Sequence, residues 1–322
     1  MLRMLLRRLL QLIPLLLGVI VFNFALIQAA PGSFLDVMTA EQQVSDPAIV
    51  ERLRITYGMD QPPLVQLWRY VVSIAHLDFG FSYRQNAPVI DIIMAQLPAT
   101  LLLMVSAISI AVLVGSAAGV IAAVKVGSGW DSLISALAVF FFAAPSFWLG
   151  IMLVVLFSVK LGWLPVGGMQ TIGLDGSAWI QLVDVMRHLA LPALTLGLFY
   201  AAIYARVMRA SMLEVARMDY VRAARAKGLS GARVVVAHVL RNAMLPVVTL
   251  VGLQLGTALG GSVVIEAVFS WPGIGSLLFD SVMSRNYPVV LGVMVLSALV
   301  VAVCNLAVDM AYLKLDPRVQ LR

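Results

Sequence analysis

The stretch IIMAQLPATLLLMVSAISIAVLVGSAAGVIAAV, residues 92–124, carries no charged side chain from one end to the other. An Arg, Lys or Asp at the centre of a membrane helix costs roughly 2.5–3.5 kcal/mol on insertion scales, so long uncharged runs are the clearest sign of a membrane span. A helix needs about 20 apolar residues to cross the hydrocarbon core. The stretch is therefore predicted to cross a bilayer as a helix.

The composition of the whole chain agrees with this prediction. Hydrophobic residues make up 61% of the chain and charged residues only 12%, and the mean hydropathy is +0.98. The surface of a soluble domain requires about a quarter charged residues, which excludes that class. We expect an all-α integral membrane protein.

Five further uncharged runs bring the predicted number of transmembrane helices to six. The first run is too long for a signal peptide and has Ile27 or Gln28 where a small residue is needed before a cleavage site, so we expect it to remain as an anchor. The single cysteine, Cys304, excludes a disulfide within one chain. The five runs are residues 9–35, 132–159, 189–205, 242–265 and 286–308.

The basic residues are distributed unequally between the two sides that six spans define. One side, which includes both termini, carries 15 of the 22 Lys and Arg residues and 5 of the 16 Asp and Glu residues. Because cytoplasmic loops hold the excess of Lys and Arg, both termini are expected in the cytoplasm. This asymmetry also accounts for the pI of about 9.7, so we expect no nucleic-acid partner. We do expect the protein to contact membrane lipid.

The connection between the first two spans, residues 31–91, is expected outside. It contains Pro-rich turns and several aromatic residues and is large enough to fold on the membrane surface. Two interpretations stay open for it: packing over helix ends, or reception of an extracytoplasmic partner.

The cytoplasmic connection 206–241 concentrates eight Arg or Lys residues, and a short helix is predicted near residues 217–231. Asp219 suits a helix N-terminus, Arg225 and Lys227 suit the C-terminus, and Gly228 suits a left-handed cap. Such a helix could lie on anionic lipid. Alternatively, its alanines could enter the groove of a partner protein whose acidic rim pairs with the flanking cations.

The predicted spans contain no ionisable side chain, although proton-coupled carriers usually place such residues in the membrane. The chain also lacks the phosphate-binding loop of an ATPase and histidines at metal-binding spacing. We therefore expect no catalysis, bound cofactor or metal in this chain, and an energy source in a partner. A sodium-coupled secondary carrier remains the alternative, because backbone oxygens can bind sodium. A membrane-anchored receptor is a further alternative.

Glycines spaced four residues apart indicate close packing of two spans, because small residues let helix backbones approach. The neighbouring helix could belong to this chain or to another subunit. The glycines are Gly115 and Gly119 in the second span and Gly252, Gly256 and Gly260 in the fifth.

Two adjacent cytoplasmic segments, DYVRAARAKGL at 219–229 and HVLRNAMLP at 238–246, resemble the signature of binding-protein-dependent ABC importer permeases. The closest resemblance is to the dipeptide, oligopeptide and nickel group, in which Arg222 replaces the usual Glu before two alanines. Four further segments resemble the B-type permease of that group: DFGFSYR at 78–84, LPATL at 97–101, EAVFSWPGIG at 266–275 and LDPR at 315–318.

The resemblance implies a type I ABC importer permease fold with six transmembrane helices in a bacterial inner membrane. Residues 1–91 would form the first helix and an extracytoplasmic segment, 92–312 a five-helix core, and 313–322 a cytoplasmic tail. The implied partners are a second homologous permease, two ATPase subunits that bind ATP and Mg, and an extracytoplasmic solute-binding protein. Dipeptides, longer peptides, glutathione and chelated nickel all remain possible substrates.

The resemblance also implies roles for two sets of residues. The coupling helix that docks the ATPase would present Asp219, Tyr220, Arg222, Ala223, Ala224, Arg225, Ala226, Lys227 and Gly228. An outer segment would contact the binding protein or close the outer gate. Alternatively, it would form a tight turn that caps two helices. Its residues are Glu266, Trp271, Pro272 and Gly273.

Overall fold

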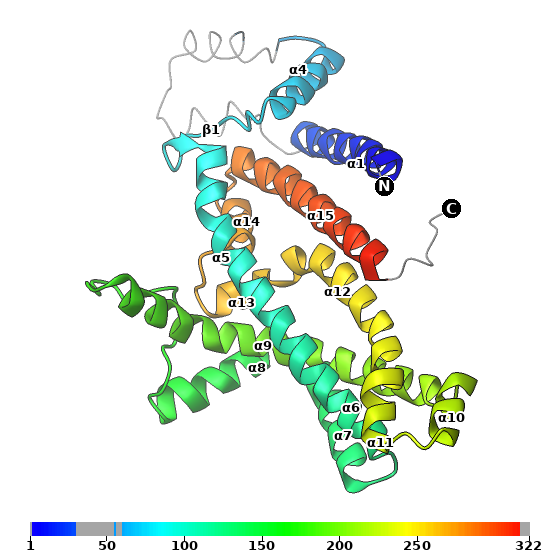
Figure 1. Ribbon diagram of the computed structural model, residues 1–322. Helices are drawn as coiled ribbons and strands as arrows, with labels where there is room; N and C mark the ends of the chain where they lie inside the picture. Colours follow the sequence, from blue (N-terminus) through cyan, green and yellow to red (C-terminus); the bar gives the residue numbers. More distant parts are fainter. Residues whose placement is uncertain (1, 30–54, 56–59, 316–322) are drawn as a thin grey trace. The chain divides into compact units, whose positions relative to one another are not determined.

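A computed structural model of the chain describes residues 2–29, 55 and 60–315, and these residues are mostly helical (Figure 1). The sheet among them is a two-stranded antiparallel ribbon of β1 (Phe81–Ser82) and β2 (Ala87–Pro88). The all-α prediction is confirmed. The chain forms two compact units: the first contains residues 1–98 and 273–306, and the second contains residues 99–272 and 307–322.

The first unit is built around an apolar cluster between helices distant in sequence. Its fully buried members include Val89, Ile93 and Val289. A buried polar contact adds to it: Asn286 Nδ2 donates to Ser82 Oγ at 2.8 Å, which ties the ribbon to the residue that precedes the last helix. The helices that contribute are α1 (Leu2–Ala29), α4 (Pro63–Ala75), the first part of α5 (Val89–Ile110), α14 (Ile274–Met283) and α15 (Tyr287–Leu315).

The second unit begins inside α5, which continues through η1 (Ala111–Gly115) into α6 (Ser116–Val124). Together they form an apolar helix of 36 residues that closely matches the quoted stretch. A turn with Gly127 at φ +77° leads to α7 (Gly129–Ala143).

The third predicted span, residues 132–159, is not one straight helix. After α7 the chain continues as α8 (Ser146–Leu153) and η2 (Val154–Lys160), and the two parts meet at 106°. The bend falls where Ala144 has an extended backbone, with ψ 132°. Pro145 explains it, because proline lacks an N–H for the helix ladder and disfavours a helical conformation in the residue before it.

The fourth span, α9 (Ala178–Val215), is a 38-residue helix and therefore much longer than the predicted run 189–205. Its basic residues find partners that permit this extension. Arg209 donates to Asp131 from Nε at 2.7 Å and from Nη2 at 2.9 Å, and the Arg206 guanidinium lies 4.4 Å from the centre of the Phe142 ring. Helix α9 packs against α6, α7, α8 and α12 and is the central element of the second unit.

The fifth predicted span, residues 242–265, is interrupted at Ser262. A continuous helical segment runs from α11 (Gly231–Val234) through η3 (Val235–Leu240) into α12 (Arg241–Gly261), and α13 (Val263–Val268) follows the break. The segment thus begins eleven residues earlier than the uncharged run, inside the basic connection.

Several helices in the described part of the chain are long and apolar enough to cross a membrane. Four qualify singly, at residues 89–124, 178–215, 231–254 and 287–306, and the bent pair α7 and α8–η2 supplies a fifth if it counts as one span. The apolar stretch in α1, residues 10–26, is shorter. The protein is a multi-pass membrane protein. Six complete spans stay a prediction, because the apolar stretch of α1 is shorter than the other candidate spans.

The second-span glycines face a helix of the same chain. A Cβ atom on Gly115 would lie 2.5 Å from the Ala201 carbonyl oxygen, and one on Gly119 would lie 2.6 Å from that of Ala205. These backbone oxygens belong to α9, so the two glycines set the distance between α9 and the continuous helix formed by η1 and α6. Gly252 is buried. The surroundings of Gly256 and Gly260 lie outside what the structure describes.

Gly119→Ala is expected to destabilise the protein, because its methyl group would collide with the α9 backbone. Overpacking of this kind costs about 1–3 kcal/mol, more than the roughly 0.5–1 kcal/mol that alanine gains over glycine in a helix. The melting temperature in detergent should fall. Gly129→Ala is the control, since no atom lies within 4 Å of its added Cβ; equal melting temperatures for the two variants would contradict the packing.

Candidate functional site

The short helix α10 (Asp219–Ala226) is present where the sequence predicts it. Asp219 lies in its first turn and Arg225 in its last, so both charges complement the helix dipole. Gly228 has φ +80°, and its N–H donates to the Arg225 carbonyl at 2.9 Å. The left-handed cap is therefore formed.

One face of α10 is buried in its own chain. Val221 has no exposed surface and Ala224 is 7% exposed. Both belong to an apolar cluster with Met208 and Met212 of α9 and Ala243 of α12. Ala224, which was expected to face the ATPase, thus faces the protein interior.

Tyr220 ties α10 to the helix that follows it. Its hydroxyl donates to the His238 carbonyl at 3.2 Å and accepts from Asn242 Nδ2 at 2.6 Å. Asn242 Nδ2 also approaches the same carbonyl at 3.2 Å. These bonds join the first turn of α10 to η3 and α12, so Tyr220 orients the helix.

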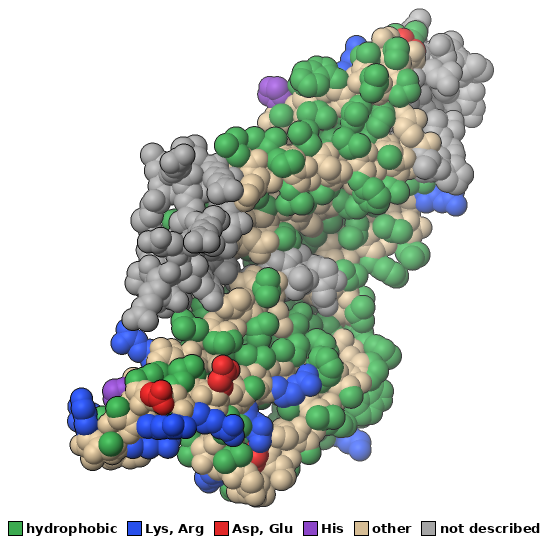
Figure 2. Space-filling view, turned by 90° about the vertical axis from the view of Figure 1, so that its right-hand side faces the viewer, with side chains coloured by type: hydrophobic (Ala, Val, Ile, Leu, Met, Phe, Trp, Pro, Cys, Tyr) green, Lys and Arg blue, Asp and Glu red, His purple; other side chains and the backbone are tan. Residues whose placement is uncertain are grey.

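The other face of α10 is solvent-exposed, small and cationic. Arg222 and Asp219 form an ion pair at 3.5 Å, but both side chains are largely exposed, so it contributes little stability. Figure 2 shows Lys and Arg side chains gathered on the lower part of the face in view, where Asp and Glu are fewer. The exposed residues of this face are Asp219, Tyr220, Arg222, Ala223, Arg225, Ala226, Lys227 and Gly228.

The segment 266–273, which was expected on the outer side, is mostly buried. Glu266 has no exposed surface, and its Oε1 accepts from Thr100 Oγ1 and Ser262 Oγ, both at 2.9 Å. Trp271 is equally buried and donates from Nε1 to the Ala99 carbonyl at 2.9 Å.

This burial bears on the two roles expected for the segment. Glu266 and Trp271 offer no surface to a binding protein in this conformation, and Gly273 is buried while Pro272 is half-buried. Ser270, at φ +48°, makes the turn between α13 and the tryptophan. The geometry agrees with the alternative of a tight turn, one that fastens α13 to α5 at Ala99 and Thr100. Sequence reasoning missed this because Thr100 and Glu266 are 166 residues apart.

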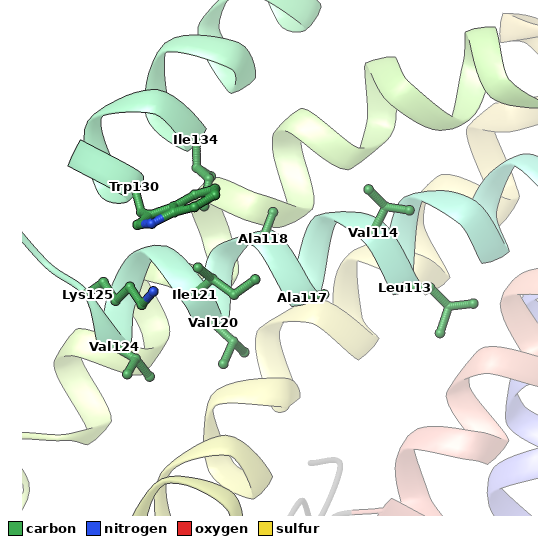
Figure 3. Close-up of a pocket in the computed structure, with 10 residues that line it drawn as sticks. All are labelled: Leu113, Val114, Ala117, Ala118, Val120, Ile121, Val124, Lys125, Trp130 and Ile134. Atoms are coloured by element: carbon green, nitrogen blue, oxygen red, sulfur yellow. The ribbon is translucent and has the colours of Figure 1, made fainter. Parts of the chain in front are cut away.

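An apolar groove of about 930 Å³ lies along α6 and α7 (Figure 3). Lys125 is the single charged residue among the described residues that line it, and its Nζ lies 5.4 Å from the centre of the Trp130 ring at one end. Acyl chains or an apolar helix suit such a wall better than a polar solute does. Within the described part of the chain, no group of three or more His, Cys, Asp or Glu residues could hold a metal.

Two family descriptions match the chain. The family described as binding-protein-dependent transport system inner membrane component matches residues 115–321, and the N-terminal part of the corresponding membrane component matches residues 1–104.

Individual relatives match over the full length. The oligopeptide transport system permease protein AppB of Bacillus subtilis is 40% identical over 98% of both chains. The di/tripeptide permease protein DppB of Pseudomonas aeruginosa is 42% identical over 98% of this chain and 97% of its own. The glutathione permease protein GsiC of Escherichia coli is 42% identical over 99% of both chains.

The fold is similar to that of a solved membrane transporter. A chain of the inward-facing MetNI methionine ABC transporter has a TM-score of 0.54 and 20% sequence identity, covering 70% of this chain and 97% of its own. At this identity the similarity concerns the fold alone.

We expect Glu266→Leu to lower the melting temperature markedly, because it removes the acceptor of two buried hydrogen bonds. Each buried hydroxyl that loses its acceptor costs about 1–3 kcal/mol. Glu266→Gln retains an oxygen acceptor and should stay near the parent protein. The control is Glu214→Leu, since Glu214 is exposed. Equal effects of Glu266→Leu and Glu214→Leu would show that the buried contacts do not hold the segment.

Proposed function

The chain belongs to the family of binding-protein-dependent transport system inner membrane components, and on this premise we propose how its cytoplasmic helix couples transport to ATP hydrolysis. It is a transmembrane permease subunit of an ATP-binding-cassette importer. The named relatives carry oligopeptides, di- and tripeptides and glutathione, so peptides or related small solutes are the proposed cargo. The comparisons give no support to an ion-coupled carrier, and that alternative is not retained.

The proposal assigns docking of a partner ATPase to α10. The observation that carries it is the division of this helix into two faces. Val221 and Ala224 are buried with α9 and α12, whereas Ala223 and Ala226 are exposed beside Arg222 and other cations. Small exposed side chains permit close approach to a groove, and the cations would pair with an acidic rim.

Movement of the ATPase would then reach the membrane through packed side chains. A displacement of α10 must carry α9 and α12 with it, because the three helices share one apolar core and the Tyr220 bonds. Inverting a population from 1:99 to 99:1 requires about 5.5 kcal/mol of differential binding. Closure of two ATPase subunits on ATP and Mg would supply it, and this chain would contribute no catalytic group.

We place both termini in the cytoplasm of a bacterial cell, with the protein in its inner membrane beside a homologous permease. The charge distribution along the sequence supports this orientation. The segment before α5 then faces outward, where a solute-binding protein would deliver the cargo.

Ala223→Trp should block ATPase docking while leaving the fold intact, because Ala223 is exposed. A bulky side chain would hold the groove away from the helix, and we expect ATP-driven uptake to fall by about tenfold or more, as for other disrupted interface centres. Co-purification of the ATPase subunits and uptake into proteoliposomes measure the effect. Ala178→Trp, at an exposed position at the start of α9, is the control. Unchanged docking and uptake in Ala223→Trp would refute the assignment.

Gly228→Val is expected to uncouple ATP hydrolysis from uptake without preventing membrane insertion. Gly228 has φ +80°, where a β-branched residue costs on the order of 1–3 kcal/mol, so the C-terminal cap of α10 should open. The solute transported per ATP hydrolysed measures coupling. Gly162→Val introduces comparable strain at φ +64°, outside the basic connection, and should retain coupling. Wild-type coupling in Gly228→Val would contradict the docking proposal.

A further inference from the structure

The first unit contains a pocket that the docking proposal does not use. It has a volume of about 630 Å³ and lies among α1, α4, the β1–β2 ribbon and the start of α15. This volume falls within the roughly 300–1,000 Å³ of small-molecule sites. The pocket is lined by residues that precede α5 and by the beginning of α15, and none of these residues belongs to α10.

Aromatic side chains provide much of the pocket wall. Phe81 and Tyr83 meet edge to face, with ring centres 5.2 Å apart. Aromatic surfaces of this kind bind apolar or aromatic side chains through large contact areas. The six aromatic residues that line the pocket are Phe24, Tyr70, Phe79, Phe81, Tyr83 and Tyr287.

Two opposite charges complete the lining. Arg69 and Asp78 are the charged residues among the described ones that line the pocket. Neither forms an ion pair with another described residue, so each can receive a charged group from a ligand. A ligand with a single charge would satisfy one of them, whereas a zwitterion would satisfy both.

The polar groups of the pocket are held in place. The Asp78 Oδ1 atom accepts from the Gly80 N–H at 2.9 Å, which fixes the carboxylate at the turn before β1. Gln28 Nε2 donates to Gln66 Oε1 at 3.2 Å, and Gln66 Nε2 donates to the Gln61 carbonyl at 2.8 Å. Two oriented side-chain amides therefore lie in the same lining as the opposite charges.

We infer that this pocket binds a short zwitterionic peptide directly, with its carboxylate at Arg69, its ammonium group at Asp78 and an apolar side chain against the aromatic wall. The inference rests on the proposed function for the peptide class and the outward orientation. It adds a site within the permease itself, where a peptide can bind before it enters the membrane pathway.

The test is equilibrium binding of radiolabelled alanyl-phenylalanine to the complete transporter in nanodiscs, without the solute-binding protein. Wild type should prefer this dipeptide over its N-acetyl and its C-terminal amide derivatives. Asp78→Asn, which retains the oxygen that accepts from Gly80, should weaken dipeptide binding about tenfold and abolish the preference for the free ammonium group. Arg69→Gln should abolish the preference for the free carboxylate.

Asp60→Asn and Arg84→Gln are the controls, because both residues are exposed and lie outside the lining. They should bind the dipeptide as wild type does. Binding that is absent in wild type, or equally strong in Asp78→Asn and Arg69→Gln, would overturn the inference. The inference would also be overturned if these two variants bound the dipeptide normally but no longer captured the solute-binding protein. The pocket would then be a contact surface for that protein.

ATP-driven uptake in the presence of the solute-binding protein separates this inference from the proposed function. Uptake by the wild-type complex together with no direct peptide binding would refute the pocket alone. Absence of ATP-driven uptake of any peptide would refute the proposed function.

Discussion

The burial of Val221 and Ala224 is the constraint on which the proposed coupling depends. These two side chains place α10 in the same apolar core as α9 and α12, and hydrogen bonds of Tyr220 fix its orientation. A cytoplasmic helix attached by loops alone could move without the membrane helices. Here the packing joins α10 to α9 and α12, so a force applied to the exposed face of α10 acts on both of these membrane helices.

The same unit is reinforced by polar contacts between its helices. Arg209 joins α9 to Asp131 at the start of α7, while Glu266 joins α13 to α5 through Thr100. Gly115 in η1 and Gly119 in α6 let α9 approach closely. In this bundle, polar side chains from distant parts of the sequence form hydrogen bonds with one another. Buried polar groups require such partners.

Hydropathy and one short signature predicted much of this arrangement. Uncharged runs located the apolar helices, and the charges and glycine around residues 219–228 predicted α10 with its cap. The bend at Pro145, the extension of α9 and the burial of Ala224 and Glu266 were missed. Each depends on a tertiary contact or on the local effect of a proline inside an apolar run, and a hydropathy pattern carries no information about which distant side chains meet.

The most direct test of rigid coupling between α10 and α9 is the distance between spin labels on the two helices. Labels at Ala226→Cys and Val183→Cys, in a Cys304→Ala background, would be measured in the complete transporter without nucleotide and with ATP and vanadate. Rigid coupling of α10 to α9 predicts the same 183–226 distance in both states, while the distance between residue 226 and a label on the proposed partner permease changes. A changed 183–226 distance would show that α10 moves independently of α9 and would contradict rigid coupling.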